Sequence, residues 1–223
     1  MNDTNADSDN RGLLTGAAQS LFGLLKLFSV MQWLGIVNPM LRARSALKPE
    51  EIASLDFSRK RAAAVDGYVA VWLGVEVLAA AAICVTHPSF AVSVAIQVVM
   101  AIRILEIVQT NLSSTLFDLV SGSPSRSPGS TARMVVMAGV NYVELLLLFG
   151  VIYGLNVSYV EGINQPVTGF YVSAMSQLSA GAGNIFPIGW VRFVQAAQGL
   201  SGAAVIVLAL VRLITAPGAK TRA

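Results

Sequence analysis

Four long apolar segments constrain the fold of this chain more than any other feature of its sequence. They cover residues 62–86, 89–118, 132–156 and 189–214. Each is long enough to cross the hydrocarbon core of a bilayer, which requires about 20 predominantly apolar residues in a helix. Charged residues make up 12% of the chain, whereas soluble domains contain about 25%. We therefore expect an all-α integral membrane protein with four transmembrane helices.

The distribution of lysine and arginine predicts how these helices are oriented. The loop between the first two spans and the segment 156–169 contain no Lys or Arg. The basic residues that flank the spans all lie in the other connections and in the two tails. They are Arg42, Arg44, Lys48, Arg59, Lys60, Arg61, Arg126, Arg133, Lys220 and Arg222. Since cytoplasmic loops are enriched in Lys and Arg, both termini are predicted to be cytoplasmic, in the inner (plasma) membrane of a cell.

The remaining segments divide the chain further. Residues 1–61 are expected to form a cytoplasmic N-terminal segment, in which 12–41 has an imperfectly amphipathic helical pattern. Such a helix lies on the inner leaflet; a fifth span is the alternative interpretation. A transmembrane hairpin at 62–120 is followed by a Ser/Pro/Gly-rich flexible linker at 121–131. Residues 216–223 form a cytoplasmic tail.

The stretch between the third and fourth spans, "SAMSQLSAGAGNIFP", interrupts the apolar pattern with spaced glycines. Residues 167–178 are apolar but too few to cross the membrane, which predicts a re-entrant pore helix. Residues 179–184 would then be non-helical backbone at membrane depth, where it is tolerated if it lines a water-filled path. Glycine permits dihedral angles that turn successive carbonyls to one side, and a ring of carbonyls can replace the hydration shell of a cation. A ring needs several chains, so oligomerisation is expected.

Residues 132–215 resemble the pore module of potassium channels, with an outer helix, a pore helix, a filter and an inner helix at 189–214. The family pattern around the filter reads S-x-x-T-x-T-T-V-G-Y-G-D-I-x-P. The corresponding residues align with it without a gap: Ser173, Ser176, Leu178, Ser179, Ala180, Gly181, Ala182, Gly183, Asn184, Ile185 and Pro187. Arg192 and Gly202 also stand where the family often has an arginine and its hinge glycine.

The resemblance implies a homotetrameric channel for a monovalent cation such as K⁺, with hinge candidates at Gly199 and Gly202. The filter would consist of Ser179, Ala180, Gly181, Ala182, Gly183 and Asn184. In the family, large Val and Tyr side chains pack behind the filter and an Asp adds negative charge. Alanines and an asparagine stand at these places here, which predicts an atypical, weakly selective filter.

Several polar residues within the spans are further candidates for function, because ionisable groups at membrane depth are rare. The charged ones are Glu76, Arg103, Glu106 and Glu144. They are expected to form a structural ion-pair cluster joining the hairpin to the pore module; a proton relay or a gating charge is the alternative. Gln195 and Gln198 on the fourth span either line the cavity below the filter or bond neighbouring helices.

The sequence offers little for catalysis. It has a single histidine and a single cysteine, and its net charge of +3 is too small to indicate nucleic-acid binding. We expect no enzymatic activity, no cofactor or bound metal, and no soluble ligand-binding domain; the partners would be membrane lipid and further copies of the chain. Two alternatives remain at this point. One is a non-conducting structural or regulatory subunit, and the other is a proton-coupled small-molecule exporter using Glu76 or Glu144.

Overall fold

The computed structural model describes residues 55–86, 88–121, 131–181 and 183–215. Within these ranges, four helices are long and apolar enough to cross a membrane. They are α5 (Leu55–Val85), α6 (Phe90–Ser121), α7 (Thr131–Leu155) and α9 (Val191–Thr215). The prediction of a mostly helical chain with four such apolar helices is confirmed, and it indicates a multi-pass membrane protein.

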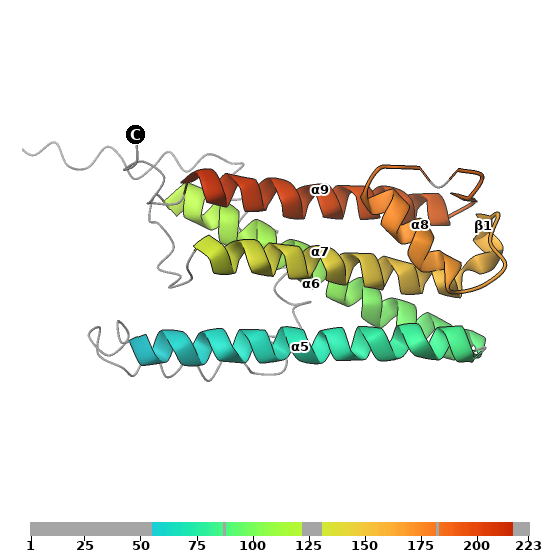
Figure 1. The fold of residues 1–223 in the computed structure, drawn as a ribbon, viewed down its shortest axis with the longest axis horizontal. Coiled ribbons are helices and arrows are strands. Elements are labelled where there is room, and N and C mark those ends of the chain that lie inside the picture. Colours follow the sequence, from blue (N-terminus) through green and yellow to red (C-terminus); the bar gives the residue numbers. More distant parts are fainter. Residues whose placement is uncertain (1–54, 87, 122–130, 182, 216–223) are drawn as a thin grey trace, which may run out of the picture.

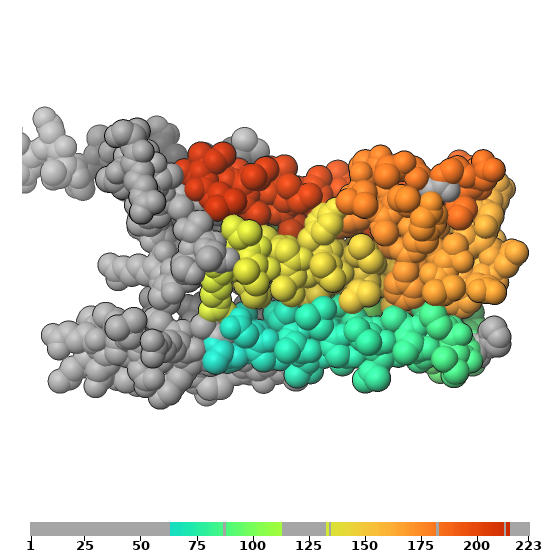
Figure 2. All heavy atoms as spheres, viewed as in Figure 1, coloured from blue at the N-terminus to red at the C-terminus, as the bar shows by residue number. Residues whose placement is uncertain are grey.

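The four long helices form an antiparallel bundle centred on α7. The axes of α5, α7 and α9 lie nearly parallel in Figure 1, with α9 running opposite to the other two, and α6 crosses obliquely behind them. Helix α7 contacts each of the other three, and Figure 2 shows its side chains as a band between those of α5 and α9. The chain alternates direction along the bundle, so the start of α5 and the end of α9 lie at the same end.

The short elements gather at the opposite end of the bundle (Figure 1). They are the 3₁₀ helix η1 (Val157–Tyr159), strand β1 (Val160–Glu161), helix α8 (Thr168–Gln177) and strand β2 (Phe186–Pro187). Helix α8 lies where the sequence predicts a helix too short to cross. The sequence did not predict the antiparallel pairing of β1 with β2.

The core of the bundle lies along α7. Leu145, Leu148, Val151 and Tyr153 have no exposed surface at all, and α7 is the most buried of the four spans. Large apolar side chains on the other helices point outward, such as Val71 and Leu78 on α5. This distribution suits a bundle in lipid, where outward apolar groups meet hydrocarbon and helices associate by close packing and interhelical hydrogen bonds.

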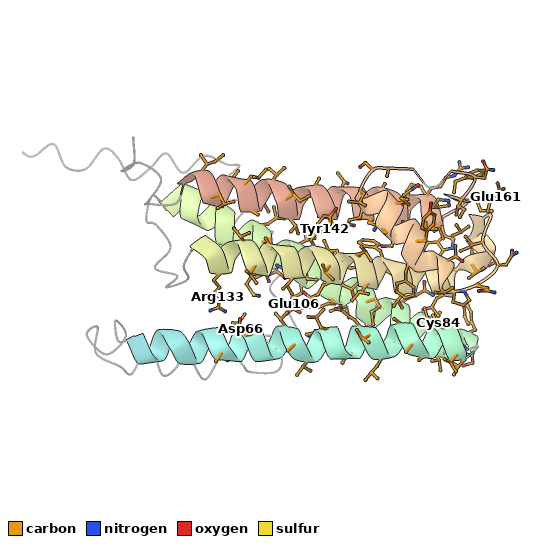
Figure 3. All side chains as sticks on the ribbon, viewed as in Figure 1. Asp66, Cys84, Glu106, Arg133, Tyr142 and Glu161 are labelled. Atoms are coloured by element: carbon orange, nitrogen blue, oxygen red, sulfur yellow. The ribbon has the colours of Figure 1, made fainter. Side chains whose placement is uncertain are left out.

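Helix α5 begins at Leu55, several residues before the predicted first span, but its apolar part, Ala63–Val85, agrees with that span. Arg133 near the start of α7 binds Asp66 of α5, with 2.6 Å between Nη2 and Oδ1 (Figure 3). Four predictions fall on residues outside the described ranges. These concern the amphipathic helix at 12–41, residues 122–130 of the linker predicted at 121–131, Ala182 of the filter and the tail at 216–223.

Candidate functional site

Helix α8 is held against α7 by a contact between glycines. A Cβ on Gly169 would lie 2.5 Å from the nitrogen of Gly154 and 2.8 Å from the oxygen of Gly150. The ring of Phe170 fills the space beside Gly150. Small residues four apart let helix backbones approach closely in membranes. The sequence signal was the "GVIYG" stretch at 150–154, which our sequence analysis missed.

Two hydrogen bonds fix the orientation of α8 on α7. The Ser173 hydroxyl donates to the Leu146 carbonyl at 2.7 Å. The Tyr142 hydroxyl donates to the Gln177 carbonyl, in the last turn of α8, at 3.1 Å. The two bonds involve Ser173 and Gln177, which lie one helical turn apart, so α8 is attached to α7 at two points along its length.

A buried polar network connects α8 to α7 and α9 through Gln198. The Gln198 Nε2 lies 2.9 Å from the Ser173 carbonyl and 2.9 Å from the Gln177 Oε1. The Tyr153 hydroxyl donates to the Gln198 Oε1 at 2.9 Å. Gln198 has no exposed surface in the chain. The sequence left two roles open for Gln198, lining a cavity or bonding neighbouring helices. Its hydrogen bonds in the structure join α9 to α7 and α8.

The other three candidate residues on α9, Gln195, Gly199 and Gly202, have different surroundings. Gln195 is exposed, and its Nε2 lies 3.2 Å from the Ser176 hydroxyl of α8. Gly202 packs against the Gln177 side chain, since an added Cβ would lie 2.9 Å from its Nε2. Gly199 has nothing within 4 Å of an added Cβ. Helix α9 is continuous through both glycines.

The loop after α8 has positive φ angles at three residues, each two positions after the last. They are 53° at Ser179, 68° at Gly181 and 64° at Gly183; Ala182 lies outside the described residues. Nothing lies within 4 Å of a Cβ added to either glycine. The loop is therefore exposed in the single chain, and the two glycines are required by backbone conformation rather than by crowding.

The first of these positive φ angles has a local cause at the end of α8. The Ser179 nitrogen donates to the Ser176 carbonyl at 3.2 Å, and the Ala180 nitrogen donates to the Met175 carbonyl at 3.0 Å. This pair of bonds is a Schellman motif, in which the residue after the helix cap takes a left-handed conformation. Serine occupies that position here instead of the usual glycine, so some backbone strain is stored at the start of the loop.

The far end of the loop is anchored to the segment before α8. Strand β2 pairs with β1, and the Ile188 nitrogen donates to the Tyr159 carbonyl at 2.8 Å. The rings of Tyr159 and Trp190 meet edge to face with centroids 6.1 Å apart. The loop is thus fixed at both ends, while the residues described in its middle, 179–181 and 183–184, are exposed.

The charged residues within the spans are brought together from three helices. Arg103 of α6 contacts Glu106 at 2.9 Å through Nη1 and Glu144 of α7 at 2.6 Å through Nη2. All three side chains are almost completely buried. Figure 3 shows Glu106 in the space between α5 and α7. One guanidinium thus bridges two carboxylates and ties the hairpin to α7.

Two aromatic residues of α5 complete this cluster, and the sequence analysis missed both. The Tyr68 hydroxyl donates to Glu106 Oε2 at 2.6 Å. The Arg103 guanidinium lies 5.2 Å from the centroid of the Tyr68 ring and 5.3 Å from that of Trp72, distances at which cation–π attraction operates. The signal was present in the sequence, because residues 68, 72 and 76 follow one another at four-residue spacing on one helical face.

Glu76, the fourth predicted member, lies beside the ion pairs without joining them. Its side chain has no exposed surface, and neither carboxylate oxygen has a hydrogen-bond partner among the described residues. It is close enough to Glu144 and Arg103 to interact electrostatically with both. The predicted cluster therefore contains an ion-paired part and one separate carboxyl group.

The geometry presents two candidate sites: an exposed loop with spaced positive φ angles, and a buried charge cluster within the candidate spans. Compared with known proteins, the chain matches no family model, no curated protein and no solved structure.

Proposed function

We propose that the chain is one subunit of a homotetrameric cation channel of the potassium-channel superfamily, with its ion path lined by the backbone carbonyls of residues 179–184. The observation that carries the proposal is the recurrence of positive φ at Ser179, Gly181 and Gly183. The loop leads from the short helix α8 into α9, which suits a re-entrant pore helix followed by a filter and an inner helix.

The dihedral pattern matters because it determines where the carbonyls point. Where left-handed and right-handed residues alternate, successive N–H groups align on one side of the backbone, and we propose that the carbonyls of this loop align on the other. A row of aligned carbonyl oxygens attracts a cation and can replace its hydration shell. The permeant ion would be monovalent, such as K⁺, and the proposal requires no other cofactor.

Weak selectivity follows from the side chains around the loop. Ala180 contributes only a methyl group, and the space around Gly181 and Gly183 is open within 4 Å of an added Cβ. The chain alone therefore does little to fix the width of the loop. We propose that neighbouring copies set this width loosely, so that K⁺ and Na⁺ permeate with similar ease.

The exposed face of α9 supports assembly with further copies of the chain. Phe193, Leu200, Val207 and Ile214 are 78%, 74%, 55% and 76% exposed, and they follow one another at seven-residue spacing. A seven-residue apolar repeat favours left-handed packing of one helix against another. We propose that these stripes meet near the axis of a tetramer, where they also bring four loops together.

The proposed topology places both termini on the cytoplasmic side of the plasma membrane, as the positive-inside pattern favours. The start of α5 and the end of α9 lie at one end of the bundle, and the loop lies toward the other. The cation path would then open from the loop at the outer face. In this proposal the protein transports ions and catalyses no reaction.

The test is purification, reconstitution into planar bilayers, and measurement of reversal potentials with K⁺ on one side and Na⁺ on the other. Gly181→Ala is the informative variant. An alanine there meets no neighbouring atom but is strained at a φ of 68°, so it alters the backbone rather than the packing. We expect single-channel currents with a small reversal potential in the wild type, and a loss of at least tenfold in conductance in the variant.

Gly139→Ala provides the matched control, because Gly139 lies within α7 and an added Cβ there also meets nothing within 4 Å. Its currents should equal those of the wild type. Native mass spectrometry of the same samples measures the number of copies. Electrical silence from a folded tetramer would favour the non-conducting subunit, and currents indifferent to Gly181→Ala would remove the loop from the ion path.

A further inference from the structure

The separate carboxyl group of Glu76 is the least satisfied polar group among the described residues. It lies near the middle of the Ala63–Val85 span, is completely buried, and has no hydrogen-bond partner at either oxygen within the described ranges. Buried carboxylates are normally paired or hydrogen-bonded, because an isolated charge in an apolar interior is strongly unfavourable. An ionised Glu76 would therefore need a nearby positive charge to offset its burial.

The cation that interacts with Glu76 is Arg103, whose Nε has no partner among the described residues but makes no hydrogen bond to Glu76. The two terminal nitrogens of Arg103 bind Glu106 at 2.9 Å and Glu144 at 2.6 Å. With all groups ionised, the cluster would hold three carboxylates and one guanidinium, an excess of two negative charges. Tyr68, on the same helix as Glu76, donates its hydroxyl to Glu106. None of these groups supplies a donor to Glu76.

Glu144 provides a second unsatisfied acceptor in the same place. Its Oε1 accepts from Arg103, while its Oε2 is buried with no partner among the described residues. The Glu144 and Glu76 carboxylates are close enough to repel each other. A proton on Glu76 would remove this repulsion and supply an O–H donor. A metal ion is less suited, since the described residues contain no group of three His, Cys, Asp or Glu that could hold one.

We propose that Glu76 is a proton-binding site at the contact between α5 and α7. Its carboxylate takes one proton from solvent to become a carboxylic acid, and the new O–H donates to the Oε2 of Glu144. The charged groups that interact with Glu76 are Arg103 on α6 and Glu144 on α7, while Glu106 on α6 binds Arg103 and the Tyr68 hydroxyl of α5. The inference does not depend on the proposed channel, because it concerns the hairpin and α7 alone.

The proton would form a hydrogen bond between α5 and α7 that is lost when Glu76 is deprotonated. With it, the α5–α7 contact contains a hydrogen bond and one fewer negative charge. Without it, two carboxylates oppose each other at membrane depth, so the contact weakens as the pH rises. The pairing of Arg103 with Glu106 and Glu144 persists in both states and keeps the hairpin attached.

Infrared difference spectroscopy of the protein in lipid tests this directly. A protonated carboxyl group has a C=O stretching band that a carboxylate lacks, and ¹³C-labelling of glutamate identifies bands that arise from Glu rather than Asp. We expect one glutamic acid band that disappears as the pH is raised. The band should be lost in Glu76→Gln and retained in Glu161→Gln, a control at an exposed carboxylate outside the spans.

Glu144→Gln gives an independent readout if Glu76→Gln does not fold. Replacing the acceptor changes the hydrogen bond made by the Glu76 hydroxyl, so the band should shift in frequency without vanishing. A band that survives in Glu76→Gln would assign the proton to Glu106 or Glu144 and overturn the proposal. Absence of any glutamic acid band in the wild type at every pH would overturn it as well.

Discussion

Gly169 of α8 lies directly against Gly154 of α7, so that a Cβ on Gly169 would stand 2.5 Å from the Gly154 backbone nitrogen. No side chain separates the two helices at this point. The position of α8, and with it the start of the exposed loop, is therefore determined by contact between main chains.

The first prediction concerns this contact. Gly169→Ala forces α8 away from α7 and should lower the free energy of unfolding by about 1–3 kcal/mol, the usual effect of overpacking. Titration of the detergent-solubilised protein with sodium dodecyl sulfate, followed by circular dichroism, measures the change. Gly139→Ala, at an open position inside α7, should leave stability unchanged or raise it by up to about 1 kcal/mol, because alanine is the better helix former. Equal effects of the two variants would contradict the close contact.

The second prediction concerns the guanidinium that bridges two helices. Arg103→Met leaves Glu106 and Glu144 without their common cation and should destabilise the protein by about 3–5 kcal/mol. Combining it with Glu144→Gln removes one of the stranded charges, so the double variant should be more stable than Arg103→Met alone. A double-mutant cycle by the same titration measures the coupling. Additive effects would mean that the ion pair is absent in the membrane.

The third prediction compares two glutamines three residues apart on α9. Gln198→Leu leaves the Tyr153 hydroxyl and the Gln177 side chain without their buried partner, and should cost about 1–3 kcal/mol for the unsatisfied groups. Gln195→Leu affects an exposed residue with a single 3.2 Å contact and should change stability by less than about 1 kcal/mol. Thermal unfolding in one detergent ranks the two variants. The reverse order would place Gln198 outside the network.

The fourth prediction concerns the strained serine that ends α8. Ser179→Gly relieves a left-handed conformation that costs other residues about 1–2 kcal/mol, and should raise thermal stability. Ser179→Val introduces a β-branched side chain at a φ of 53° and should lower it. The pair of variants tests the sign of the effect at one position. Equal melting temperatures for both would show that Ser179 is not left-handed.

The sequence was most informative about the long helices and the membrane-depth charges. Length and hydropathy were sufficient to place the four spans, because a bilayer requires about 20 apolar residues in each. The charges at Arg103 and Glu144 were expected to meet, since an isolated ionisable group is rare at that depth. The short helix at 167–178 could be recognised by its length and the glycines after it.

The sequence was least informative about which polar groups form ion pairs or hydrogen bonds with one another. Residues 76, 106 and 144 are all glutamates, and only their distances from Arg103 distinguish the two paired ones from Glu76. Pairing of β1 with β2 depends on two segments separated by α8, and a two-residue ladder leaves no periodic pattern. The burial of Gln198 depends on α8 and α7 together, which a helical wheel of α9 does not include.

Helix α7 carries one contact of the charge cluster and one contact of α8 close together. Glu144 faces the charge cluster, and Leu146 accepts the hydrogen bond from Ser173 of α8. These attachment points are separated by about 3 Å along the axis of one continuous helix. Because both points belong to one continuous helix, a rotation or tilt of α7 would displace them together. A change in the position of α7 would therefore alter the charge cluster and the seat of α8 at the same time.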